Sequence, residues 1–102
     1  MSLVNIGSVR NQALRLLDRI EPPGGIELLS YKRNRSVAIL CCHDGGYLVL
    51  EKGYAEQELA VGRDQLSRLL KTMIKREFPR NRKVRLFKFH DPAELDRIRK
   101  KI

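Results

Sequence analysis

The sequence predicts an α+β fold, an antiparallel sheet of about four to five strands with helices packed on one face. Two amphipathic helical patterns enclose several short apolar segments, and glycine-rich or polar turns separate these segments. The expected order of elements is α-β-β-β(-β)-α-β-α. A chain of 102 residues is long enough for one hydrophobic core but not for two, so residues 1–102 are expected to form a single small domain.

The first helix is expected to begin after Ser8, a good N-cap residue, and to continue to about residue 20. Pro22–Gly25 ends it, because proline has no N–H to donate and glycine frees the backbone. Met1–Leu3 reads as an expression leader, and no element is predicted there. The apolar side of this helix is expected to contain Val9, Ala13, Leu16, Leu17 and Ile20.

Apolar segments after this helix predict the strands. Ile26–Lys32 has the character of a short strand, and Ser36–His43 is apolar on both faces, which predicts a central strand covered on both sides. Asp44–Gly46 is typical of a hairpin turn, after which Tyr47–Glu51 forms the returning strand. Tyr54–Val61 alternates like a strand but also contains good helix formers, so the number of strands stays at four to five.

After Gly62, which breaks the strand pattern, the longest pattern, Arg63–Phe78, predicts an amphipathic helix that Pro79 ends. Val84–Phe89 is the expected last strand, joined by a right-handed crossover wherever it runs parallel to its neighbour. Asp91–Pro92 is a helix start, with an N-cap and a proline at the first position, and predicts a terminal helix over Ala93–Ile102. The apolar stripe of the long helix consists of Leu66, Leu69, Leu70, Met73, Ile74 and Phe78.

Charge is divided unevenly along the chain, which carries a formal net charge of +9. Residues 1–62 contain seven Lys and Arg against seven Asp and Glu, whereas residues 63–102 contain fourteen against five. The second part therefore holds the whole excess. A local excess of cations attracts anionic partners such as nucleic acids.

A basic cluster follows the long helix and predicts a non-catalytic interface for the RNA or DNA backbone. Guanidinium groups bind phosphate bidentately, and a loop held between a helix and a strand presents them at a small cost in entropy. Binding of this kind neutralises phosphates and releases counterions, so it depends on salt more than on base sequence. The predicted residues are Lys71, Lys75, Arg76, Arg80, Arg82, Lys83 and Arg85.

In element order alone, residues 8–78 resemble double-stranded RNA-binding domains, which follow the order α-β-β-β-α. The lysine-rich motif of that family lies at the start of its second helix. Here Gly62–Gln65 stands at that place and the basic cluster lies at the other end of the helix. The resemblance therefore assigns no residue a role.

Other interpretations give the chain a protein partner, a membrane surface or a chemical step. The alternative function is an interaction module that recognises an acidic protein or forms a homodimer through an exposed sheet edge. The helix over Arg63–Phe78 is also basic on one side and apolar on the other, as in helices that lie on membranes, although its apolar side is needed for the core. No segment approaches the roughly 18 apolar residues of a membrane span.

Few residues of this sequence suggest catalysis or metal binding. Cys41 and Cys42 are neighbours on a predicted strand and cannot form a structural disulfide, which favours a reducing, cytoplasmic compartment. His43–Asp44 and His90–Asp91 both fall at strand ends, where two imidazoles and two carboxylates would suit a metal or an acid–base pair if they met. Both aspartates already serve as turn or cap residues. The sequence therefore assigns no catalytic residue, metal or cofactor.

Overall fold

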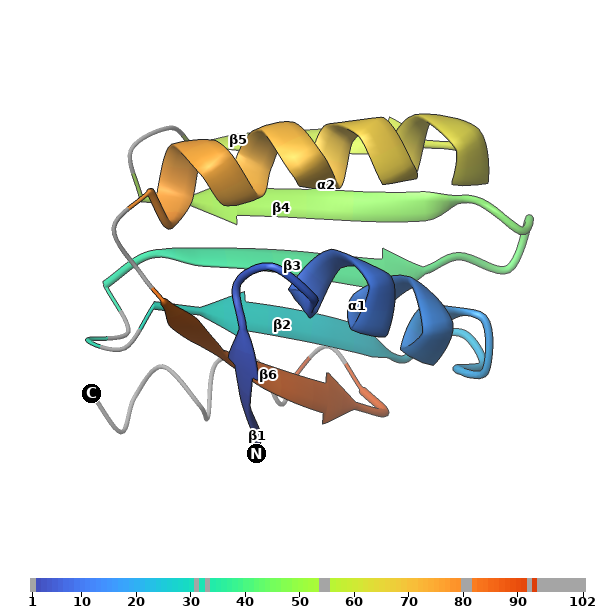
Figure 1. Cartoon of the computed structure of the whole chain (residues 1–102). Helices are drawn as coiled ribbons and strands as arrows, with labels where there is room; N and C mark the ends of the chain where they lie inside the picture. Colours follow the sequence, from blue (N-terminus) through green and yellow to red (C-terminus); the bar gives the residue numbers. More distant parts are fainter. Residues whose placement is uncertain are drawn as a thin grey trace.

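The structure, a computed structural model, describes residues 2–30, 32, 34–53, 56–79, 82–91 and 93. Within these residues the chain is α+β, with two helices on one face of an open antiparallel sheet of six strands (Figure 1). The sheet order is β1-β6-β2-β3-β4-β5. In chain order the elements are β1 (Ser2–Asn5), α1 (Val9–Leu17), β2 (Gly25–Leu29), β3 (Ser36–Cys41), β4 (Tyr47–Lys52), β5 (Gln57–Val61), α2 (Arg63–Glu77) and β6 (Lys83–Phe89).

The sixth strand is β1, in a segment for which the sequence predicts no element. It pairs with β6 at one edge of the sheet, with Val4 opposite Val84. Val4 is buried, whereas its neighbour Leu3 is exposed, as expected for side chains that alternate along a strand. Four residues with two polar ends are too few to show this alternation in the sequence. The expected count of four to five strands is therefore too low.

The last strand occupies a different place from the one a parallel crossover would give. β6 lies between β1 and β2 and is antiparallel to both. Because β5 is at one edge of the sheet, the chain crosses by way of α2 to the far side of β2 before it enters β6 (Figure 1). Every described strand pair is antiparallel, so the crossover rule for parallel strands does not apply.

The strands end where turns close them. The Ser30 N–H donates to the carbonyl oxygen of Arg35 at 3.0 Å, so β2 stops at Leu29 rather than at Lys32. The Cys42 N–H donates to the carbonyl oxygen of Gly46 at 3.0 Å and closes the expected hairpin between β3 and β4. The predicted helix over residues 93–102 lies outside the described residues except for Ala93, whose N–H donates to Asp91 Oδ1 at 2.9 Å.

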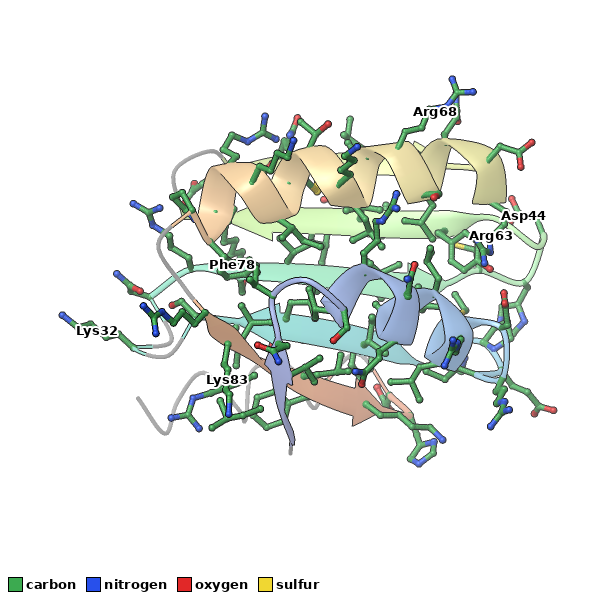
Figure 2. All side chains as sticks on the ribbon, viewed as in Figure 1. Lys32, Asp44, Arg63, Arg68, Phe78 and Lys83 are labelled. Carbon is green, nitrogen blue, oxygen red and sulfur yellow. The ribbon has the colours of Figure 1, made fainter. Side chains whose placement is uncertain are left out.

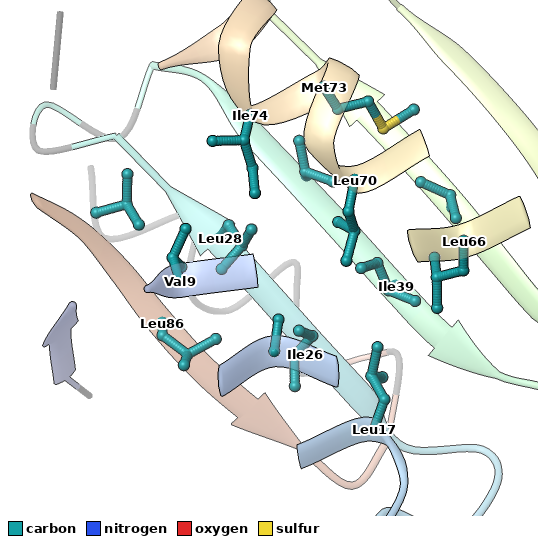
Figure 3. Packing of buried hydrophobic residues seen from close by; sticks show 14 of the residues in the cluster. Val9, Leu17, Ile26, Leu28, Ile39, Leu66, Leu70, Met73, Ile74 and Leu86 are labelled. Atoms are coloured by element: carbon teal, nitrogen blue, oxygen red, sulfur yellow. The ribbon is translucent and has the colours of Figure 1, made fainter. Parts of the chain in front are cut away.

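The core lies between the helices and the sheet (Figure 3). From α2 it receives Leu66, Leu70, Met73 and Ile74, and from α1 it receives Val9, Ala13 and Leu17. These side chains pack on the inner sides of the central strands, on residues such as Ile26, Leu28 and Ile39. Five of the six residues of the predicted α2 stripe are buried, and Leu69 is half-buried. Burial of this apolar area is the main force that holds α2 on the sheet.

The middle of the sheet is also buried on the face opposite the helices. Ala38 and Phe89 are fully buried there and pack with Leu40 and Leu50. The Phe89 ring lies against Gly25, and a Cβ added at Gly25 would lie 2.8 Å from that ring. The expectation of a central strand covered on both sides is therefore confirmed for β3.

In the described part of the chain, neither helix is long and apolar enough to cross a membrane.

Candidate nucleic-acid interface

The predicted basic residues lie around the C-terminal end of α2 and the start of β6, but not on one face. Lys71 and Lys75 are exposed on the outer side of α2, and Arg82 and Lys83 are exposed where β6 begins. Arg85 is half-buried; on β6 it alternates with the buried Val84 and Leu86, which face the helices. Arg80 lies outside the described residues.

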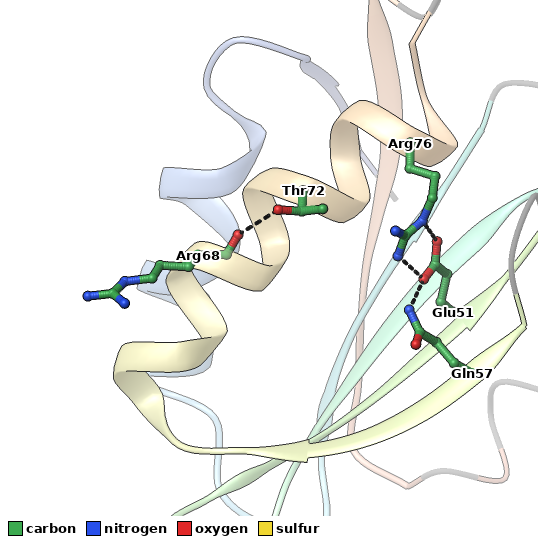
Figure 4. Close-up of polar contacts among 5 residues, drawn as sticks. All are labelled: Glu51, Gln57, Arg68, Thr72 and Arg76. Atoms are coloured by element: carbon green, nitrogen blue, oxygen red, sulfur yellow. Dashed lines mark hydrogen bonds and ion pairs between the residues drawn. The ribbon is translucent and has the colours of Figure 1, made fainter.

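Arg76 is a member of the predicted set whose charge is used inside the protein. Its Nε donates to Glu51 Oε2 at 2.7 Å and its Nη2 donates to Glu51 Oε1 at 2.6 Å (Figure 4). The Glu51 side chain is fully buried, and the Arg76 side chain is 29% exposed. A bidentate pair of this kind neutralises the guanidinium and fixes its orientation. Arg76 therefore anchors α2 to β4.

The electrostatics of Glu51 follow from its partners. Burial by itself raises the pKa of this carboxyl, but hydrogen bonds with Arg76, Glu77 and Gln57, together with the charge of Arg76, lower the pKa to about 2. Gln57 Nε2 donates to Glu51 Oε1 at 2.6 Å.

A second set of contacts closes the same end of the molecule. Arg35, the last residue of the β2–β3 connection, donates from Nη1 to the carbonyl oxygen of Glu77 at 3.3 Å. Gly53, in the turn after β4, has φ of 151°, and a Cβ there would lie 2.8 Å from Arg35 Cγ and overlap the Glu77 carboxyl. These contacts join two strand connections to the end of α2. The end of α2 is therefore held against the strand connections that carry the exposed cations.

The first half of the chain contributes cations to this end that the sequence did not indicate. Lys32 lies in the β2–β3 connection and Lys52 at the end of β4, and both are exposed. Figure 2 shows Lys32 and Lys83 reaching outward at the same end of the sheet. We call this the basic end, defined by Lys32, Arg35, Lys52, Lys75, Arg82 and Lys83. A count of charge by halves hid it, because three of the carboxylates that balance these cations in the sequence, Asp18, Glu21 and Asp44, lie at the other end of the sheet.

Exposed carboxylates gather at the opposite end of the sheet, where β2 and β4 begin and β3, β5 and β6 end. There Asp18 accepts hydrogen bonds from Arg63 Nε at 3.2 Å and Nη2 at 3.3 Å. The hydrogen bond with Asp18 raises the pKa of Arg63. Near the basic end, Glu51 and Glu77 are buried, and the exposed carboxylates are Glu56 and Glu58 at the start of β5. The exposed acidic residues at the opposite end are Asp18, Glu21, Asp44, Asp64 and Asp91.

The two histidines and the two cysteines lie at or near the end of the sheet opposite the basic end. His43 and His90 are both exposed near that opposite end, but no group of three or more His, Cys, Asp or Glu side chains there is placed to hold a metal ion. Cys41 is buried and Cys42 half-buried, and both are free thiols. Burial raises the pKa of the Cys41 thiol, which keeps it protonated and unreactive.

Comparison with known proteins adds no relative. Four strands separate α1 from α2, so the chain departs from the three-strand order of double-stranded RNA-binding domains. Searches against protein-family models, curated proteins and solved structures find no match to this chain.

Proposed function

We propose that the protein binds the phosphate backbone of RNA or DNA through the basic end. One observation carries this proposal: Lys32, Lys52, Lys75, Arg82 and Lys83 are exposed at the same end of the sheet. In the part of the chain that the structure describes, none of these five side chains is in an ion pair. Cations left open to solvent in one region create a positive potential that attracts a polyanion.

The mechanism is neutralisation of phosphates with release of their counterions. Lysine and arginine side chains from two connections, two strand ends and α2 reach a curved or flexible backbone from several directions. If five cations each contact one phosphate, the logarithm of the binding constant falls with the logarithm of salt concentration with a slope of about −4. No base-reading groups are needed, so the expected sequence preference is small.

Two arginines take a supporting role in this proposal: Arg76, which belongs to the predicted set, and Arg35, which does not. Arg76 and Arg35 support the basic end through Glu51 and the Glu77 carbonyl, while the exposed cations contact the ligand. Lys71, one turn before Lys75 on α2, extends the surface along the helix. The free thiols suit a cytoplasmic location, in which nucleic acid is the most abundant polyanion.

The test is binding of a labelled single-stranded RNA and a duplex DNA as a function of salt. The Lys32→Glu/Arg82→Glu variant should bind both at least about 100-fold more weakly than the natural chain at low salt, because two contacts become repulsive. Because both side chains are exposed, the melting temperature should change by only a few degrees.

The matched control is Arg19→Glu/Lys88→Glu, which changes the net charge equally but at exposed positions away from the basic end. It should weaken binding only a few-fold, through the lower net charge alone. The proposal is wrong if the natural chain binds neither nucleic acid at low salt, or if the two double variants weaken binding equally.

A further inference from the structure

A shallow groove of about 350 Å³ runs between α2 and β5, on a side of the molecule distinct from the basic end. Its floor is apolar, with Leu59 and Val61 from β5 and Leu69 from α2. These three side chains are half-buried: they pack against the core and leave one side open. Leu69 is the residue of the predicted apolar stripe of α2 that is only half-buried. The remaining lining residues are Gln65, Arg68 and Thr72.

β5 forms one wall of this groove and is also an edge of the sheet. It pairs with β4 on one side, and no described strand pairs with its other side. An edge strand presents unpaired N–H and C=O groups, which a second extended chain can bind by continuing the ladder. Gln57, Leu59 and Val61 point to the helix side of β5, whereas Glu58 and Ala60 are exposed on the other side. The groove therefore lies next to an open ladder.

Charge selects the kind of chain that fits. Arg68 is the ionisable residue that lines the groove, and its exposed side chain makes no ion pair among the described residues. Thr72 Oγ1 donates to the Arg68 carbonyl oxygen at 3.4 Å, while the guanidinium extends away from the helix (Figure 4). Toward the far end of β5, Arg76 and Gln57 are already held by Glu51. Among the described residues that line the groove, Arg68 is thus the cation left for an anionic group on the incoming chain.

A second copy of this chain fits poorly in the same place. A two-fold axis at the middle of β5 would bring the two α2 helices side by side, and each Arg68 would face its own equivalent. Two chains that each carry a net charge of +9 also repel one another. Like charges that meet across an interface disfavour it.

We propose that this groove binds an extended acidic peptide segment of a partner protein, which adds a strand to β5. Side chains of the bound strand alternate between the two faces of the sheet. On the groove side, an apolar residue lies over Leu59, Val61 and Leu69, and an acidic residue two positions away reaches Arg68. On the other side, near Glu58, the peptide carries neutral residues. This site is independent of nucleic-acid binding at the basic end.

The probe is a fluorescein-labelled peptide of eight residues. Threonine occupies every second position, and valine and glutamate take turns at the positions between. The natural chain should bind it, and Arg68→Glu should weaken binding about tenfold or more. A second peptide with lysine in place of glutamate should bind the Arg68→Glu variant better than it binds the natural chain. In NMR spectra of the isotope-labelled protein, addition of the peptide should shift the amide signals of β5 and of the adjacent side of α2.

Three controls separate this site from general attraction between opposite charges. A peptide of equal charge in which proline replaces two threonines cannot form the ladder and should not bind. Lys88→Glu removes a cation away from the groove and should leave binding unchanged, as should Lys32→Glu/Arg82→Glu at the basic end. Equal binding of the proline peptide, or no effect of Arg68→Glu, overturns the proposal. A dimer in sedimentation equilibrium that Leu59→Asp disperses would also overturn it, in favour of a second copy.

Discussion

Arg76 holds Glu51 by two hydrogen bonds of 2.7 and 2.6 Å, and this pair joins the last turn of α2 to β4. The carboxylate is fully buried, whereas the guanidinium keeps partial contact with solvent. A residue that the sequence predicts to contact phosphate thus has a structural role. The pair also lies between the two proposed binding surfaces. Gln57 of β5 donates a hydrogen bond to Glu51, and on the side of the basic end Glu77 bonds to both Glu51 and Arg35.

The first prediction concerns the unequal cost of removing each partner of this pair. Arg76→Met leaves the Glu51 carboxylate buried without its cation and should destabilise the protein by about 3 kcal/mol. Glu51→Leu leaves an arginine that can turn to solvent and should cost about 1–2 kcal/mol. The double variant removes both charges of the pair, so no carboxylate loses its cation, and it should be more stable than Arg76→Met alone. Urea denaturation gives the three free energies of unfolding, and additive losses would contradict this account.

The second prediction concerns acid. The pKa of Glu51 is lowered from 4.5 to about 2 in the folded protein. Stability from this carboxylate is therefore complete above about pH 4.5 and is lost as the pH falls toward 2. The difference in free energy of unfolding between the natural chain and Glu51→Gln should be constant from pH 7 to 5 and should shrink below pH 4.5. A difference that stays constant down to pH 2 would show that Glu51 has an ordinary pKa.

The third prediction concerns Gly25, where β2 begins. A Cβ at this position would overlap the backbone carbonyl oxygen of Ile39 and press on the Phe89 ring. Because neither the β3 backbone nor a buried aromatic ring can yield easily, Gly25→Ala should destabilise the protein by about 1–3 kcal/mol. Gly7→Ala is the control, since a Cβ at Gly7 has no neighbour within 4 Å. Thermal unfolding of the two variants compares them directly, and equal melting temperatures would count against the close approach at Gly25.

The fourth prediction tests β1. Val4 is 5% exposed in the core, and Leu3 is 50% exposed on the opposite side of the same strand. Val4→Asp would bury a carboxylate among apolar side chains and should cost about 3 kcal/mol or more. Leu3→Asp should change the free energy of unfolding by less than about 0.5 kcal/mol. If both variants have the same stability as the natural chain, the first five residues are not part of the sheet.

Elements with strong periodicity were predictable from the sequence. The α2 stripe around Leu70, the Asp44–Gly46 hairpin and the buried β3 are local patterns, and each is present at the expected place. β1 was not predictable, because its four residues form a strand only by pairing with β6, about eighty positions away in sequence. The antiparallel placement of β6 between β1 and β2 is also a long-range result.

The same division applies to the candidate sites. Residue types and their order along the chain determined the two amphipathic helices, the α+β class and the excess of cations after residue 62. Folding determined which cations remain available. Burial of Glu51 draws Arg76 into an ion pair, and the β2–β3 connection brings Lys32 to the end where Lys83 lies. The physical reason is that periodicity acts between neighbours in sequence, whereas charge acts through distances in space that only strand pairing establishes.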